Sequence, residues 1–243
     1  MQIRTIKEDT KLSKRTIAAA IMILLCIPLT LAVGIFCFED RNYYLISIII
    51  VALSIIPFAL VFESRKPQAR ELVIIAVLVA IAVAGRAAFF AVPQFKPVVA
   101  IVIIAGVCFG GEAGFMVGAV TGFVSNFLFG QGPWTPWQMF AFGIIGFLAG
   151  ILFKKGVLPK KKLPLCIFGG VATLVIYGLI MDTASLLMFS QTATWQSLLA
   201  MYATGLPFNL IHAAATVVFL LILSKPMIEK LDRVKKKFGL LEP

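Results

Sequence analysis

Uninterrupted apolar runs, each about as long as a bilayer is thick, recur through this chain and limit what it can fold into. One of them, TIAAAIMILLCIPLTLAVGIFCF at residues 16–38, contains no charged side chain. A helix of about 20 apolar residues crosses the ~30 Å hydrocarbon core of a membrane. Only 14% of the 243 residues are charged, whereas roughly 25% is usual for a soluble domain. These features predict a polytopic membrane protein.

The spanning segments are expected to be helices. Backbone polar groups inside a bilayer must be hydrogen-bonded within the protein, which leaves only helices and closed β-barrels. The apolar runs lack the alternating pattern of barrel strands. The first run is expected to be retained as a helix, since no convincing small-residue cleavage site precedes Glu39. We therefore predict an all-α membrane protein with eight spans, at about residues 17–38, 43–62, 70–90, 97–111, 113–129, 137–153, 164–189 and 200–223.

Basic side chains gather in four clusters, at residues 1–16, 63–70, 154–162 and 225–237. With eight spans, all four clusters lie on the same side of the membrane. Loops rich in Lys and Arg usually face the cytoplasm, so both termini are predicted to be cytoplasmic. Arg41, Arg86 and Lys96 then face outward. The net charge of +11 is thereby explained by membrane topology rather than by nucleic-acid binding.

The apolar stretch between residues 97 and 129 is interrupted only by GGEAG. Paired glycines commonly mark a turn, so Gly110-Gly111 is predicted to separate two short helices. A single helix here would move the basic cluster at 154–162 to the outer side, against the charge rule. Short Gly-rich helices usually pack in the interior of a bundle.

Composition divides the chain into three predicted parts. Residues 1–69 are expected to form a cytoplasmic N-terminus and an accessory two-helix hairpin, because their apolar runs contain few polar or small residues. Residues 70–224 carry polar residues at membrane depth and are expected to form a six-helix functional domain. Residues 225–243 are expected to form a basic cytoplasmic tail. No internal repeat is evident, which weakens the case for a two-fold symmetric secondary transporter.

Two basic residues near the predicted outer face are the first candidate binding residues. Arg86 lies near the end of the third predicted helix, and Lys96 follows in the next loop. A basic residue at this depth is costly unless it reaches the interface, pairs or meets an anionic ligand. Few acidic residues are available nearby. A ligand with a carboxylate or phosphate would suit both side chains.

The segment FGQGPWTPWQ at residues 129–138 differs most from its surroundings. Its Gln131 and Gln138, with the preceding Asn126, can hydrogen-bond to a heterocycle or an amide. Trp134 and Trp137 offer flat faces for stacking, and two prolines restrict the backbone. An aromatic belt at the membrane interface is the alternative interpretation. We expect this segment to form a lid or wall of a ligand pocket.

Polar residues in the last two predicted helices extend the set of candidate binding residues. Such residues inside a membrane usually face a polar interior and often mark a ligand or ion path. His212, the single histidine, is interpreted as a hydrogen-bonded packing residue, although imidazole is also a common ligand for a metal-containing substrate. The candidates here are Tyr177, Asp182, Asn209 and His212.

Motifs for catalysis are missing from the sequence. No GxxxxGK[ST] phosphate loop, HExxH or GxSxG occurs, so no catalytic residue, resident metal or cofactor is expected. The cysteines have no paired spacing and are interpreted as small buried hydrophobic residues. They are Cys26, Cys37, Cys108 and Cys166.

Small residues on the third predicted helix form a smooth strip. Ala76, Ala80 and Ala84 recur every four residues and therefore share one helix face. Another helix can approach such a strip closely. Packing within the bundle and packing against a partner subunit are both compatible with this pattern.

Two stretches of this sequence resemble a known family. RELVIIAVLVAIAVAGR at 70–86 and FKPVVAIVIIAGVCFGGEAGFMVGAVTGFVSNFLFGQGPWTPWQMFAFGIIG at 95–146 resemble the substrate-binding S components of energy-coupling factor (ECF) transporters. The resemblance extends over roughly residues 70–223. It is strongest to the vitamin B12 and queuosine-type branch, in which a similar GQGPWTPWQ segment precedes a helix. The N-terminal hairpin departs from the minimal six-helix pattern of the family.

This resemblance implies a six-helix S-component bundle in a bacterial plasma membrane that binds a vitamin or related micronutrient near the outer face. Its implied partners are a transmembrane coupling subunit, onto which Ala76, Ala80 and Ala84 would pack, and two cytoplasmic ATPases. A corrinoid or corrinoid precursor is the first expectation for the ligand, and queuosine or another purine-like base is the second. The residues themselves also allow a second interpretation, a stand-alone secondary transporter with Asp182 as the coupling acid. A membrane enzyme acting on a lipid is disfavoured, because acidic and metal-binding motifs are missing.

Overall fold

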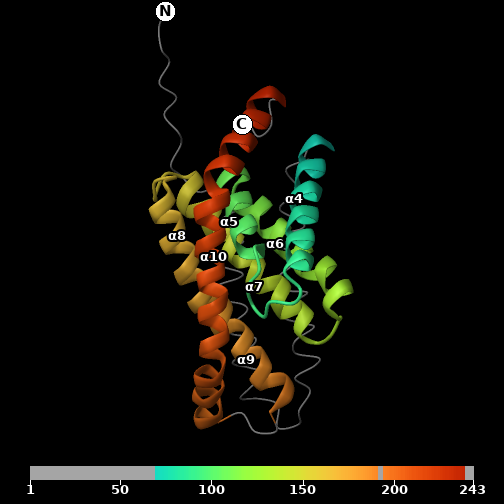
Figure 1. Ribbon diagram of the computed structural model, residues 1–243, viewed down its shortest axis with the longest axis vertical. Helices are drawn as coiled ribbons and strands as arrows, with labels where there is room; N and C mark the ends of the chain where they lie inside the picture. Colours follow the sequence, from blue (N-terminus) through green and yellow to red (C-terminus); the bar gives the residue numbers. More distant parts are fainter. Residues whose placement is uncertain (1–68, 191–193, 239–243) are drawn as a thin grey trace, which may run out of the picture.

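The computed structural model describes residues 69–190 and 194–238, and within these ranges it contains helices and no strands (Figure 1). The predicted helices at 17–38 and 43–62, and with them the accessory hairpin and the eight-span count, lie outside the described residues. The helices are α4 (Ala69–Ala88), α5 (Val98–Phe109), α6 (Gly111–Phe129), α7 (Trp134–Ala149), α8 (Lys162–Val171), α9 (Gly178–Phe189) and α10 (Trp195–Phe238). The π-helical segment η2 (Gly150–Lys154) continues α7, and η3 (Ala172–Tyr177) joins α8 to α9.

Five of the helical segments in the described ranges are long and apolar enough to cross a membrane. They are Ala69–Ala88, Gly111–Phe129, Trp134–Lys154, Lys162–Phe189 and Trp195–Phe238. The chain is therefore a multi-pass membrane protein, as the apolar runs predicted. The shorter α5 has 12 residues, a length of about 18 Å.

Helix α5 lies at the centre of the bundle. All of its residues are buried, and it contacts α4, α6, α7, α8 and α10. Its sequence VVAIVIIAGVCF is apolar on every face, which is typical of a helix surrounded by other helices. The helix ends at Gly110, whose φ of 100° suits glycine and breaks the α-helical path before α6 begins. The predicted division of this apolar stretch at Gly110-Gly111 is confirmed.

Glycines bring the backbones of α5, α6 and α7 into close contact. A Cβ added at Gly114 of α6 would lie 2.7 Å from the Cα of Gly106 and 2.7 Å from the carbonyl carbon of Gly146. Real Cβ atoms do not approach other atoms so closely, so a larger residue would force the three helices apart. The predicted interior packing of the Gly-rich helices is confirmed.

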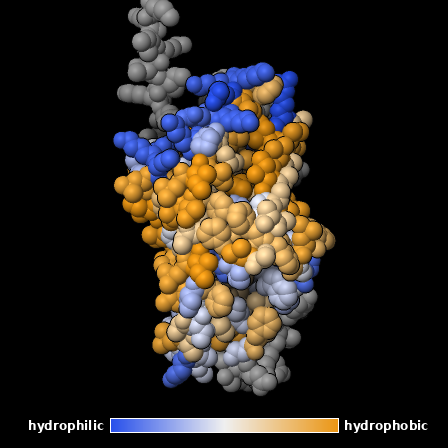
Figure 2. Space-filling model, viewed as in Figure 1, coloured by the Kyte–Doolittle hydropathy of each residue, from blue (hydrophilic) through white to orange (hydrophobic). Residues whose placement is uncertain are grey.

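Basic residues from three parts of the chain meet at one end of the bundle. Lys154 and Lys235 donate hydrogen bonds to the last carbonyls of α5, those of Phe109 (3.3 Å) and Cys108 (2.8 Å). Cations are favourable there because the helix dipole is negative at its C-terminus. The guanidinium of Arg70 lies 5.5 Å from the ring centroid of Phe238. Figure 2 shows hydrophilic side chains at this end, beside a broad hydrophobic band. That it faces the cytoplasm stays a prediction.

The last helix is longer than the sequence predicted. It was expected to end near residue 223, whereas α10 continues through Pro226 to Phe238. The prediction treated the basic residues after Ser224 as a solvated tail. Lysine and arginine are, however, good helix formers. Part of the predicted tail at 225–243 is therefore an extension of a membrane-spanning helix.

We expect Gly146→Ala to destabilise the protein by about 1–3 kcal/mol, because the new methyl group would overlap the backbone of α6. The matched control is Gly170→Ala on α8, where the added Cβ would meet only the Val217 side chain, at 3.1 Å. Thermal unfolding of the detergent-purified protein measures both effects. Equal Tm values for the two variants would contradict the close packing of α5, α6 and α7.

Candidate functional site

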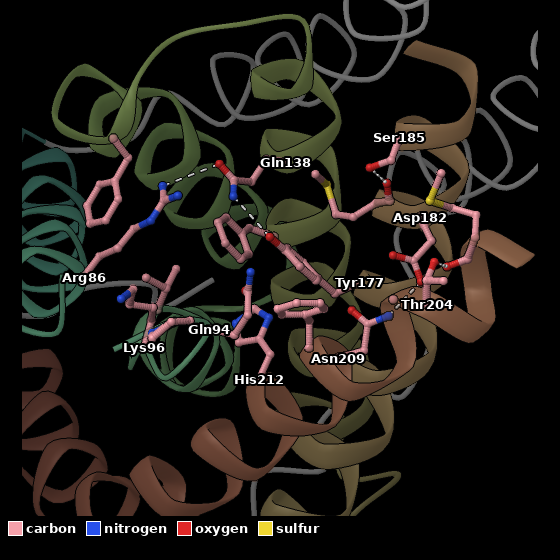
Figure 3. Close-up of a pocket in the computed structure, with 18 of the residues that line it drawn as sticks. Arg86, Gln94, Lys96, Gln138, Tyr177, Asp182, Ser185, Thr204, Asn209 and His212 are labelled. Carbon is pink, nitrogen blue, oxygen red and sulfur yellow. Dashed lines mark hydrogen bonds between the residues drawn. The ribbon is translucent and has the colours of Figure 1, made fainter. Parts of the chain in front are cut away.

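A cavity of about 680 Å³ lies between the end of α4, the loop that follows it, and helices α7, α9 and α10 (Figure 3). Arg86 lies in the last turn of α4, whereas Arg70 lies in its first turn. The pocket is therefore at the end of the bundle opposite to the basic residues around Arg70. Seven of the residues proposed from the sequence line the cavity: Arg86, Lys96, Gln138, Tyr177, Asp182, Asn209 and His212.

Arg86 is held at one side of this pocket by neutral groups. Its Nη1 donates hydrogen bonds to the Ser125 hydroxyl, to Asn126 Oδ1 at 2.9 Å and to Gln138 Oε1 at 3.4 Å. The guanidinium carbon also lies 4.3 Å from the ring centroid of Phe129, close enough for a cation–π interaction. The positive charge is therefore oriented but not neutralised by these contacts.

Lys96 adds a second positive charge on the same side. Its Nζ donates to the backbone carbonyls of Phe89, Phe90 and Val92, the last at 2.6 Å, and so folds back over the end of α4. Partial burial, and to a smaller extent the nearby charge of Arg86, lowers the pKa of Lys96. The loop between α4 and α5 thus holds this ammonium group at the mouth of the pocket.

The middle of the pocket is aromatic. Gln138 Nε2 donates to the Tyr177 hydroxyl at 3.1 Å, and the Tyr177 ring stacks on Phe142 with centroids 5.1 Å apart. His212 meets the Tyr177 ring edge-on, at a centroid distance of 4.6 Å. Tyr177 ends η3, and π-helical turns frequently occur at functional sites.

His212 carries an unsatisfied polar atom. Its side chain is only 3% exposed, and its Nδ1 has no hydrogen-bond partner within the described part of the chain. A buried nitrogen without a partner costs about 1–3 kcal/mol. A ligand in the pocket could satisfy it. The interpretation of this histidine as a hydrogen-bonded packing residue stays a prediction.

Asp182 lies on the other side of the pocket, on α9. Its Oδ2 accepts a hydrogen bond from Asn209 Nδ2 on α10 at 2.8 Å. Gly205 allows the two helices to approach here, because a Cβ at that position would lie 2.5 Å from both carboxylate oxygens. The acidic side chain therefore also has a neutral partner.

Four predicted site residues do not line this pocket. Asn126 is 1% exposed and lies behind Arg86, where it also donates to Thr135. Gln131 is exposed and donates to the Phe123 carbonyl at 2.9 Å. The Trp134 ring lies against Gly132, and Trp137 is 2% exposed in a hydrophobic cluster. The stretch FGQGPWTPWQ therefore runs from the last residue of α6 into the first turns of α7, and only its Phe129 and Gln138 line the pocket.

Several pocket residues were not predicted from the sequence. Phe142 follows Gln138 by one helical turn, Ser185 follows Asp182, and Gly205 precedes Asn209. Spacings of three and four residues place such pairs on one helix face. This periodicity, counted from the predicted polar residues, is the signal that could have found them.

Fold and site together define a helical membrane protein with a pocket lined by polar and aromatic side chains at one end of its bundle. The chain belongs to the family described as ECF transporter, substrate-specific component, and residues 70–224 match it. The family resemblance seen in the sequence is thus confirmed, whereas the cobalamin and queuosine branch is not. Members of this family work with ECF membrane and ATPase modules.

Curated relatives cover part of the chain. A UPF0397 protein of Vibrio atlanticus (strain LGP32) is 30% identical over 118 residues, which is 46% of this chain and 64% of the relative. A UPF0397 protein of Aliivibrio salmonicida (strain LFI1238) is 29% identical over 106 residues, which is 42% of this chain and 56% of the relative. The chain thus spans less than two thirds of the length of these relatives. No solved structure matches it.

We expect Asn126→Leu to lower stability by about 1–3 kcal/mol, because the buried amide that accepts a hydrogen bond from Arg86 and donates one to Thr135 is lost. Gln131→Ala, at an exposed position of the same network, is the control and should cost less than about 0.5 kcal/mol. Thermal unfolding in detergent again provides the measurement. An Asn126→Leu variant as stable as wild type would show that Arg86 does not depend on this network.

Proposed function

We propose that this protein captures a vitamin-like micronutrient at the outer face of a bacterial membrane and delivers it inward. The coupling would require a transmembrane partner and two cytoplasmic ATPases. The observation that carries the proposal is the pocket itself. It lies at the end of the bundle opposite to the basic residues around Arg70. Charged, amide and aromatic side chains line it.

The size of the pocket bears on the class of ligand. A volume of about 680 Å³ falls within the range of ~300–1,000 Å³ that encloses drug-sized molecules. A complete corrinoid is far larger and would have to remain mostly outside. A smaller corrinoid precursor or a purine-like base related to queuosine fits better, with its ring beside Tyr177 and Phe142. We therefore favour the smaller ligands.

The alanine strip on α4 supports a partner surface. Ala76, Ala80 and Ala84 are all exposed, and the large apolar side chains of Val77 and Ile81 beside them are 51% and 44% exposed. Within the part of the chain that the structure describes, these side chains point away from the interior of the bundle. A helix of the coupling subunit could approach the strip closely, since alanine leaves the backbone accessible.

We expect Ala80→Trp to abolish uptake and to leave ligand binding by the purified protein unchanged, because the large ring would separate α4 from the coupling subunit. The matched control is Ala214→Trp, at another exposed alanine, on α10. Uptake is measured in cells that co-express the transporter module, and binding by isothermal titration with the co-purified molecule. Loss of binding in Ala80→Trp would argue against a partner surface.

A second candidate is a stand-alone secondary transporter coupled through Asp182. The half-buried carboxylate with only a neutral partner, Asn209, is the observation that favours it. Acids of this kind often serve ion or proton pathways.

Uptake distinguishes the two mechanisms. For the ATP-driven importer we expect uptake to disappear when the ATPase subunits are omitted and to persist when the proton gradient is dissipated. The secondary transporter requires the opposite pattern. The ATP content of the cells is measured in the presence of the uncoupler, because loss of ATP would also stop an ATP-driven importer.

A further inference from the structure

The pocket contains charges of both signs that do not pair with each other. Arg86 and Lys96 lie on one side and Asp182 on the other, with Gln138, Tyr177 and His212 between them (Figure 3). Arg86 donates hydrogen bonds to hydroxyl and amide oxygens, and Asp182 accepts one from the Asn209 amide. Those of Lys96 go to backbone carbonyls. These neutral partners fix the positions of the three charges without cancelling them.

Separated charges of this kind are expensive in a membrane protein. Intramembrane ionisable residues normally pair with one another or face a functional cavity. Here the three charged side chains face one cavity and have neutral hydrogen-bond partners. Gly205 even provides the space that Asp182 occupies, because any larger residue at that position would collide with the carboxylate.

The groups between the charges suit a flat, polar ring. The Tyr177 and Phe142 rings are nearly parallel, with an interplanar angle of 21°, and Gln138 can exchange hydrogen bonds beside them. His212 contributes the unsatisfied Nδ1. An elongated molecule with a heterocyclic centre would contact both charged sides and also provide this nitrogen with a partner.

Building on the proposed function, we propose that the pocket selects a dipolar micronutrient. The molecule presents a carboxylate or phosphate to Arg86 and Lys96, and it presents a positively charged or N–H-donating nitrogen to Asp182. Asn209 orients the Asp182 carboxylate through Oδ2, which leaves Oδ1 for the ligand. Asp182 is then a specificity-determining residue for the nitrogen-bearing end rather than a coupling acid.

The test is to release the small molecules bound to the purified wild-type chain and identify them by mass spectrometry. We expect a single major molecule that carries both an acidic group and a basic or N–H nitrogen. Arg86→Met and Asp182→Asn should each retain at least tenfold less of it. Gln131→Ala should retain as much as wild type, because this exposed residue does not line the pocket.

The outcomes separate this inference from the proposed function. A bound molecule with an acidic group alone, or undiminished retention by Asp182→Asn, would overturn the dipolar assignment and leave the S-component function intact. A wild-type protein that retains no small molecule contradicts both. If a variant fails to fold, the identity of the molecule released from the wild-type chain still decides the question.

Discussion

Close backbone contact between α5, α6 and α7 is the constraint on which the rest of this structure depends. In a bilayer, apolar side chains gain little by leaving lipid for protein, so helices associate through close packing and internal hydrogen bonds. Gly106, Gly114 and Gly146 make that packing possible because they remove the side chains that would separate the three helices. The short α5 can then be buried completely, and α7 is fixed in the orientation that directs Gln138 and Phe142 into the pocket.

The pocket lies beside the first turns of α7. There α7 still packs closely on α6, at Phe142 and Met139, while η3, α9 and α10 line the cavity. Polar residues there form one network. It joins Arg86 to Asn126 and Thr135 and, through Gln138, to Tyr177. Since this network links different helices, Arg86 is held by the packed part of the bundle.

The sequence was a good guide to the helices and to the polar residues inside them. Apolar runs and the Gly110-Gly111 pair were sufficient to locate α5 and α6, because hydrocarbon thickness and backbone geometry leave few alternatives. Tyr177, Asp182 and His212 could be predicted as pocket residues for a related reason. A polar group within an apolar helix is stable only where it faces the protein interior.

The sequence was a poor guide to the direction of individual side chains at the start of α7. Trp137 and Gln138 are adjacent, yet neighbouring residues on a helix point about 100° apart. Gln138 therefore faces the pocket while Trp137 packs into the cluster that contains Phe115 and Ala184. Phe142 and Gly205 do not stand out by themselves in an apolar run, and only their spacing of one helical turn from Gln138 and Asn209 indicates that they line the cavity.

Helix α10 connects the two ends of the molecule. It carries Gly205, Asn209 and His212 at the pocket, and more than 20 residues later its Lys235 bonds to the last turn of α5. Pro207 lies within the pocket-lining part and cannot donate a backbone hydrogen bond to the preceding turn. Pro226 lacks the same bond nearer the basic end. The helix is therefore held at both prolines by its packing on neighbouring helices, which are α9 and η3 on the pocket side and α8 and α5 beyond it.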